Sequence, residues 1–196
     1  MIKKIAIGLV AVIVVLLGIG MVLPKQVHVE RSTVIKASPE QVWTWVSSFD
    51  NFNKWSPWFE LDPNAKYTYS GTPGTVGAKM SWVSDNRNVG SGSQEILVLD
   101  KPNKAELSLD FGAEGTAKAA YVLVKDGDGT KFTWTFDGDM GSSPIGGWFG
   151  LMMDGMLGPD YEKGLAKLKK LAEAGPAAGG DAKKAADMPS EGTATK

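Results

Sequence analysis

The sequence contains no cysteine and only one histidine, His28, among its 196 residues. Without cysteine there is no disulfide, no thiol nucleophile and no thiolate metal ligand. A nucleophilic triad needs a base, and we expect His28 to be solvated at the start of the first strand. We therefore expect no catalytic residue, no metal and no cofactor, and a fold stabilised by packing alone.

An excess of positive charge is also missing. Residues 26–174 carry 15 Lys and Arg against 19 Asp and Glu, a net charge of −4. Neutralising nucleic-acid phosphates requires clustered Lys and Arg. The composition therefore predicts that nucleic acid is not a partner.

Polar side chains are absent from a run of 19 residues that begins at Ile5 and ends at Leu23. A helix of this length spans about 28 Å, close to the thickness of the hydrocarbon core of a bilayer. A buried core helix is the alternative, but such a helix usually shows a polar stripe. We expect residues 1–25 to be a transmembrane anchor.

A cleaved signal peptide is the main competing interpretation of this segment. Lys3 and Lys4 precede the apolar run, and Gly18 and Gly20 are small enough to resemble a cleavage site. The run is longer than a signal h-region and lacks Ala-x-Ala, which favours an uncleaved anchor. The positive charges before the run outnumber Lys25 after it. The positive-inside rule then places the N-terminus in the cytoplasm and the rest of the chain in the periplasm or extracellular space.

The other end of the chain has the composition of a disordered tail. Gly175 and Pro176 predict a helix stop, and Met188 is the only large apolar residue that follows. Such a segment buries too little surface to offset the entropy of ordering it. We therefore expect a tail at residues 175–196 and a single domain at residues 26–174.

The domain begins with a predicted strand at residues 27–36, which alternate and are rich in Val and Thr. Ser38 as N-cap, followed by Pro39 and Gln41, predicts a helix to about residue 48. We expect Asp50 to cap a second short helix that Pro57 ends.

Short alternating runs separated by turn residues follow, and they predict an antiparallel meander with one buried face. The runs are residues 66–70, 76–83, 93–100, 105–111, 117–125 and 131–137. Alternation places the following residues on the buried face: Val76, Ala78, Met80, Trp82, Ala105, Leu107, Leu109, Phe111, Phe132, Trp134 and Phe136.

A long helix is predicted from about residue 145 to residue 174. Its apolar positions, interpreted as one stripe, are Trp148, Met152, Met156, Tyr161, Leu165, Leu168 and Ala172. We expect Gly155, Gly158 and Pro159 to bend this helix. The order of elements predicts an α+β fold in which a curved antiparallel sheet of about seven strands grips the C-terminal helix.

Five local motifs occur on the expected elements. They are Ser-Pro-Glu-Gln-Val-Trp at 38–43, Trp-Ser-Pro-Trp at 55–58 with Leu-Asp-Pro at 61–63, Gly-Ala-Lys at 77–79, Gly-Ser-Gly-Ser at 90–93 and Tyr-Glu-Lys-Gly-Leu at 161–165. Together they resemble the SRPBCC superfamily, in its polyketide cyclase/dehydrase and lipid-transport branch. This resemblance implies a START-like helix-grip fold with a deep apolar cavity for lipids, polyketides or other hydrophobic molecules. It does not imply one chemistry.

Soft and aromatic side chains dominate the expected cavity wall, and such residues adapt to apolar ligands. The candidate ligand-binding residues are Trp55, Trp58, Met80, Trp82, Leu107, Leu109, Tyr121, Trp134, Phe136, Trp148, Met152 and Met156. A solid core is the alternative for this set. Trp55 and Trp58 could rim the cavity mouth, rest in a membrane interface or form a local core.

Three functions fit these observations. The first is a membrane-anchored domain that binds a hydrophobic small molecule or lipid without transforming it. The second is a cyclase or dehydratase in which Tyr121, Ser81 or Asp154 transfers protons. The third is a protein-interaction domain at the membrane, for which we expect an apolar patch on the outer surface.

Overall fold

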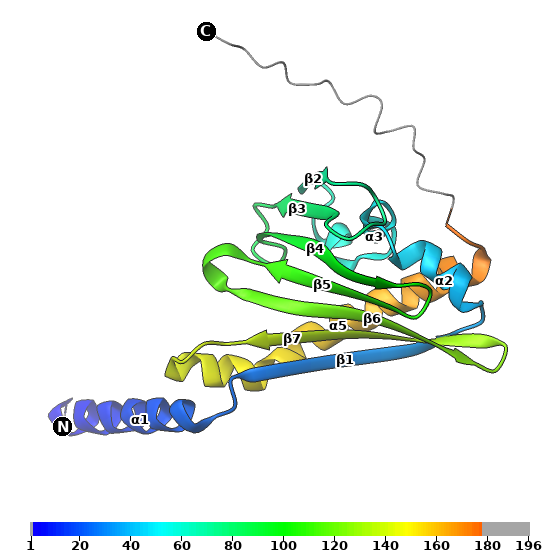
Figure 1. Ribbon diagram of the computed structural model, residues 1–196. Coiled ribbons are helices and arrows are strands. Elements are labelled where there is room, and N and C mark those ends of the chain that lie inside the picture. The colour runs from blue at the N-terminus through cyan, green and yellow to red at the C-terminus, as the bar shows by residue number, and fades with distance from the viewer. Residues whose placement is uncertain (1, 178–196) are drawn as a thin grey trace, which may run out of the picture.

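The computed structural model describes residues 2–177 and contains one antiparallel sheet. Its strands are β1 (Gln26–Ile35), β2 (Lys66–Ser70), β3 (Lys79–Val83), β4 (Ser91–Asp100), β5 (Lys104–Asp110), β6 (Thr116–Asp126) and β7 (Gly129–Asp139). The spatial order is β1-β7-β6-β5-β4-β3-β2, so β1 joins the end of the meander. Figure 1 shows helix α5 (Pro144–Ala174) lying behind the sheet and running along β1. The predicted helix-grip architecture is confirmed.

Helix α1 (Ile2–Val22) extends away from the sheet (Figure 1). It is the one helix among residues 2–177 that is long and apolar enough to cross a membrane, a criterion that a signal sequence also meets. Its large side chains are exposed, Leu9 to 61% and Val12 to 55%. Its last two turns contact the domain through the start of α5.

Three short helices follow β1, where the sequence predicts two. Helix α2 (Pro39–Val46) begins at Ser38, whose Oγ accepts a hydrogen bond from the Gln41 amide at 3.3 Å, as predicted. Helix α3 (Phe49–Trp55) is capped by Ser48, so the assignment of Asp50 as its cap is wrong. Pro57 opens a third helix, α4 (Pro57–Leu61), because proline fits the first helical position, which needs no donor.

The six predicted strands of the meander are all present, with ends that differ by no more than three residues. Residues of the predicted buried face meet in rows across the sheet. One row joins the predicted Phe136 and Leu107 with Val29 and Ala119. Val76 does not belong to this face: it lies in the connection before β3 and is 61% exposed. The sheet otherwise presents its inner face as the sequence predicts.

Helix α5 begins at the N-cap Ser143 and ends before Gly175, close to both predicted bounds. It continues as one helix through Pro159. Beyond it the chain folds back on α2, where the Trp45 Nε1 donates to the Gly175 carbonyl at 2.9 Å. Residues 175–177 of the expected tail are therefore placed against the domain, and residues 178–196 lie outside the described part of the chain.

Candidate functional site

Aromatic rings fill the middle of the space between the sheet and α5. This aromatic cluster consists of Phe52, Trp55, Trp58, Tyr121, Phe132, Trp134 and Tyr161. The Trp134 and Tyr161 rings stack with centroids 3.8 Å apart, and Trp55 meets Trp134 edge-on at 5.1 Å. Such contacts add to the burial of large apolar surfaces. This part of the grip is a packed core, the alternative that the sequence leaves open.

The loop around Trp55 and Trp58 joins this core. Trp55 is fully buried, and its Nε1 donates to the Trp45 carbonyl at 3.1 Å. Trp58 is half-buried, with its ring 5.8 Å from that of Trp134. Both side chains therefore serve packing, and they do not form the exposed aromatic surface that a protein-interaction domain would use.

The stripe expected on the C-terminal helix divides into two faces. From Met156 to Tyr161 the spacing is five residues, which turns the side chain about 140° around the helix axis. The apolar core-facing residues of α5 are Met153, Leu157, Tyr161, Leu165, Leu168, Leu171 and Ala172. Met152 and Met156 are 58% and 54% exposed, so their expected place between sheet and helix is wrong.

Trp148 also lies outside the grip, against α1. Its Nε1 donates to the Leu16 carbonyl at 3.0 Å. Gly20 and Gly147 allow this close approach, because a Cβ at either position would overlap the backbone of the other helix. The start of α5 is thus attached to the end of the apolar N-terminal helix.

The space between the sheet and α5 is less tightly closed at the end of the sheet that lies next to α1. One row of the inner face there joins Val27, Gly138, Ala117, Leu109, Gln94 and Met80. We call this region the half-closed end. Its half-buried apolar side chains are Trp82, Leu109, Phe111, Ala117, Met140 and Met153.

The indole of Trp82 helps to form the half-closed end. It lies over Gly92, where a Cβ would come within 2.7 Å of the ring, and this explains a glycine of the Gly-Ser-Gly-Ser motif. Its ring centroid is 6.1 Å from that of Phe111. Of the predicted site residues, Met80, Trp82 and Leu109 meet here, whereas Leu107, Tyr121, Trp134 and Phe136 belong to the closed core.

Gln94 is the polar residue of the half-closed end, and sequence reasoning missed it. Its side chain points to the inner face and is 5% exposed. Its hydrogen-bonding contact in the structure is a long one, from Nε2 to the Met80 Sδ at 3.9 Å. A buried amide normally has better partners. The sequence does contain a signal for Gln94. It lies two residues before the inward-facing Ile96 on the same strand, so both side chains point to the inner face.

Two hollows formed by the described residues lie outside the grip. One, of about 590 Å³, is on the outer face of the sheet and is lined by charged side chains, among them Lys79, Glu95, Lys118 and Asp137. The other, of about 490 Å³, lies between the loops around Asn64 and Asp85. Charged side chains line both hollows, unlike the mainly hydrophobic and aromatic walls of small-molecule pockets, although Leu109 and Ala117 also border the first.

The candidate proton-transfer groups are poorly suited to that role. Burial raises the pKa of the Tyr121 phenol well above its ordinary value, so the group stays protonated near neutral pH. Hydrogen bonds from Arg31 lower the pKa of Asp154, which stays ionised. Ser81 points to the outer face with Lys79. Among residues 2–177, no group of three or more His, Cys, Asp or Glu side chains could hold a metal ion.

His28 and Arg31 form ion pairs on either side of β1. On the outer face, His28 Nδ1 lies 2.7 Å from Asp137 Oδ1, and this contact raises the pKa of His28. On the inner side, the Arg31 guanidinium contacts Asp154 at 2.8 Å and Glu162 at 3.0 Å. Gly158 makes room for it, since a Cβ there would overlap the guanidinium. Arg31 therefore attaches both halves of α5 to β1.

A family model for polyketide cyclase / dehydrase and lipid transport proteins matches residues 26–173. A comparison with curated protein sequences finds no match. The match begins at the first residue of β1, so α1 lies before it.

Solved structures share the fold at low sequence identity. A protein from Chromobacterium violaceum is 16% identical with a TM-score of 0.54, and the match covers 77% of this chain and 99% of that one. The Aha1 dimer from Colwellia psychrerythraea is 17% identical with a TM-score of 0.53, and the match covers 75% of this chain and 96% of that one. A protein of unknown function from Staphylococcus aureus is 13% identical with a TM-score of 0.57, and the match covers 76% of this chain and 96% of that one. At these identities the likeness shows the fold alone.

Proposed function

Because the chain belongs to the polyketide cyclase / dehydrase and lipid transport family, we propose that it binds a lipid or another hydrophobic small molecule at the half-closed end of the grip, without transforming it. The observation that carries this proposal is the pairing of half-buried apolar side chains with a nearly buried, weakly bonded amide, that of Gln94. Apolar sites with a few oriented polar groups are typical of ligand pockets.

The ligand enters beside the packed core and not through it. Its apolar part lies along Leu109, Ala117 and Phe111, which still have surface to bury. Each CH₂ group transferred from water contributes about 0.8 kcal/mol. Gln94 donates to or accepts from the polar end of the ligand, which gives its amide the partner that Met80 supplies only weakly.

Helix α1 anchors this domain to a bilayer and is retained. Its length and hydropathy fit a membrane span. The contacts of Leu16 and Gly20 with Trp148 and Gly147 support retention, because cleavage after Gly20 would leave the start of α5 without these partners. Lys3 and Lys4, at the start of α1, favour an N-terminus in the cytoplasm and the domain on the other side of the bilayer. Tethering raises the effective concentration of membrane lipids at the site.

The proposal is tested by filling the half-closed end with a larger side chain. Ala117→Phe introduces a ring on the inner face, whereas the matched control Ala120→Phe introduces the same ring on the half-exposed outer face of the same strand. The full chain is extracted from membranes in mild detergent, and bound molecules are identified by native mass spectrometry.

We expect a lipid-sized adduct on the unmodified chain and on Ala120→Phe, and its loss from Ala117→Phe. Gln94→Leu, which removes the amide at similar volume, is expected to weaken binding while leaving the fold intact. Equal adducts on both phenylalanine variants would place the bound lipid elsewhere and contradict the proposal.

A further inference from the structure

The first three turns of α5 carry an apolar stripe that the packed core does not use. Ile145, Phe149, Met152 and Met156 follow one another at spacings of four, three and four residues, so they share one helix face. Their exposed fractions are 59%, 48%, 58% and 54%. Asp154 is the only charged residue between positions 144 and 159, and it is paired with Arg31. A contiguous apolar face of this kind marks an interaction surface.

The stripe begins beside the apolar run of α1. Trp148 is bonded to the carbonyl of Leu16, seven residues before the run ends at Leu23. At a rise of 1.5 Å per residue this contact lies about 10 Å inside the end of the apolar segment. With α1 spanning a bilayer, the start of α5 would therefore lie within one leaflet.

The polar groups around the junction fit a membrane surface. Lys25 Nζ donates to the Met21 carbonyl at 3.2 Å and to the Ser142 carbonyl at 3.3 Å, so one cation lies where the apolar run of α1 ends and just before α5 begins. Trp and Lys are the side chains enriched at bilayer interfaces. Further along α5, Gly150 lies against Pro24, which follows α1. Asp154 then contacts Arg31 on β1, so α5 moves away from α1 toward its C-terminal end.

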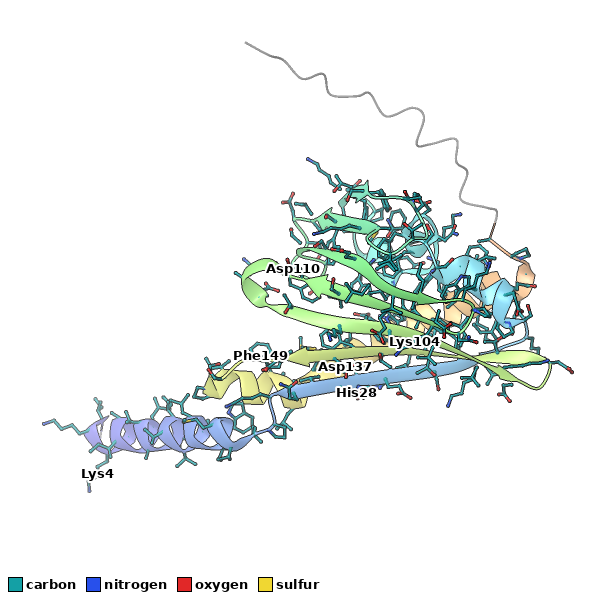
Figure 2. All side chains as sticks on the ribbon, in the orientation of Figure 1. Lys4, His28, Lys104, Asp110, Asp137 and Phe149 are labelled. Atoms are coloured by element: carbon teal, nitrogen blue, oxygen red, sulfur yellow. The ribbon has the colours of Figure 1, made fainter. Side chains whose placement is uncertain are left out.

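We propose that residues 144–157 of α5 insert into the leaflet that holds the C-terminal end of α1, with Ile145 and Phe149 deepest and Met156 near the headgroups. This inference rests on the proposed role of α1 as a retained membrane anchor. The lipid bilayer is the partner because the start of α5 contacts the exposed apolar helix α1, and the stripe itself contains no charged residue. Figure 2 shows Phe149 at the end of α5 next to α1 and Lys4 at the far end of α1.

Insertion also orients the domain. The hairpin between β6 and β7 lies at the opposite end of the sheet from α1 (Figure 1), and it would project away from the bilayer. The half-closed end lies at the α1 side of the sheet, so it would face the headgroup region. A lipid could then pass from the leaflet to the proposed binding site without crossing water.

Depth-dependent fluorescence quenching tests the insertion. The chain has no cysteine, so each introduced cysteine is a unique labelling site. Phe149→Cys, Met152→Cys and Met156→Cys are labelled with an NBD fluorophore in the full chain and reconstituted into phosphatidylcholine vesicles that contain doxyl-labelled acyl chains. Val12→Cys in α1 is the reference for the anchor. Val124→Cys, which is 56% exposed near the distant hairpin, is the control for aqueous exposure.

An interfacial helix is buried by roughly 5–10 Å, so we expect quenching at residue 149 to be at least about twofold stronger than at residue 124, and to decrease from 149 to 156. Quenching at residue 12 without quenching at 149 would overturn the insertion while leaving the anchor in place. Absence of quenching at both would overturn both. Disulfide formation between Phe149→Cys chains, with no quenching at 149, would identify a second copy as the partner and overturn the bilayer assignment. Lipid adducts on Ala117→Phe are measured separately and report only on the ligand site.

Discussion

The two halves of α5 differ in what their apolar side chains contact. In the second half, Tyr161, Leu165 and Leu168 are buried against the sheet and the short helices. In the first half, Phe149, Met152 and the rest of the apolar stripe remain exposed. This half is held by Met153 and Leu157, which pack against the core, by glycine contacts with α1 and by Arg31. Figure 1 shows these halves at opposite ends of the grip.

The second half of α5 therefore contributes mainly to the stability of the fold, and the first half is available for interactions. The second half completes a core of stacked rings that leaves little room for a ligand. The first half retains apolar surface beside the half-closed end, where a lipid and a bilayer could both be contacted. Substitutions in the two halves are therefore expected to have different consequences, and the following predictions are ordered from the largest effect to the smallest.

Trp134→Ala has the largest expected effect, because it removes the ring that stacks on Tyr161 and contacts Trp55. We expect the free energy of unfolding to fall by about 3–5 kcal/mol. Urea titration of the full chain in detergent micelles, followed by circular dichroism, measures the change. Met152→Ala, an exposed position in the first half, is expected to change the same quantity by less than about 0.5 kcal/mol. Comparable losses in the two variants would remove the distinction between the halves.

Gly20→Leu affects the first half alone. A side chain at Gly20 overlaps the Pro144 carbonyl and the Trp148 ring, whereas one at Gly18 meets open space. We expect amide hydrogen exchange in residues 144–150 to become at least about tenfold faster in Gly20→Leu, with no change in residues 161–172, because local openings have their own free energies. Gly18→Leu is the matched control. The same exchange rates in both variants would show that the contact between α1 and α5 does not hold the first half.

Asp154→Asn is expected to have a smaller effect, since Asp154 is largely exposed. Arg31 lowers the pKa of Asp154 below its ordinary value of 3.8, so the pair stabilises the fold above that pH and the contribution is lost as the pH falls through the lowered value. The thermal midpoint of the unmodified chain should exceed that of the variant at neutral pH. The difference should vanish in strong acid and shrink at about 1 M salt. A difference that persists in acid would exclude the ion pair as its cause.

His28 gives the smallest and most specific signal. Its contact with Asp137 raises its pKa above 6.5, so its contribution to stability is complete below pH 6.5 and is lost as the pH rises through the raised value. Both groups are exposed, so we expect less than about 1 kcal/mol. As the only histidine, His28 gives a single imidazole signal for NMR titration. Asp137→Asn should return its pKa toward 6.5, and an unchanged pKa would contradict the pairing.

Most of the fold could be predicted from the sequence, because strand alternation and capping residues are local signals. The position of Trp134 on the inner face followed from its phase with Phe132 and Phe136. Pro57 was misassigned because a proline that ends one helix can also open the next. Whether side chains fill the space between the sheet and α5 depends on tertiary packing, which no local pattern shows. The rings that fill the middle of this space could therefore not be predicted.

The site was predicted less well than the fold. The single-stripe interpretation places Met152 and Met156 inside, but the five-residue step to Tyr161 moves to another helix face, and both methionines are exposed. Gln94 is polar, so the criterion of an apolar cavity wall does not select it, although its phase with Ile96 indicates an inward amide. The attachment of Trp148 to Leu16 depends on a contact across 132 positions of the chain, which no local pattern contains.

Photocrosslinking in native membranes tests the central claim most directly, that the half-closed end receives an apolar ligand at the bilayer. p-Benzoylphenylalanine replaces Phe111 at the half-closed end or Val124 near the distant hairpin, and the adducts formed on illumination are identified by mass spectrometry. The account predicts an adduct of lipid or other hydrophobic small-molecule mass at position 111 and none at position 124. No such adduct at position 111, with the fold intact by circular dichroism, would contradict it.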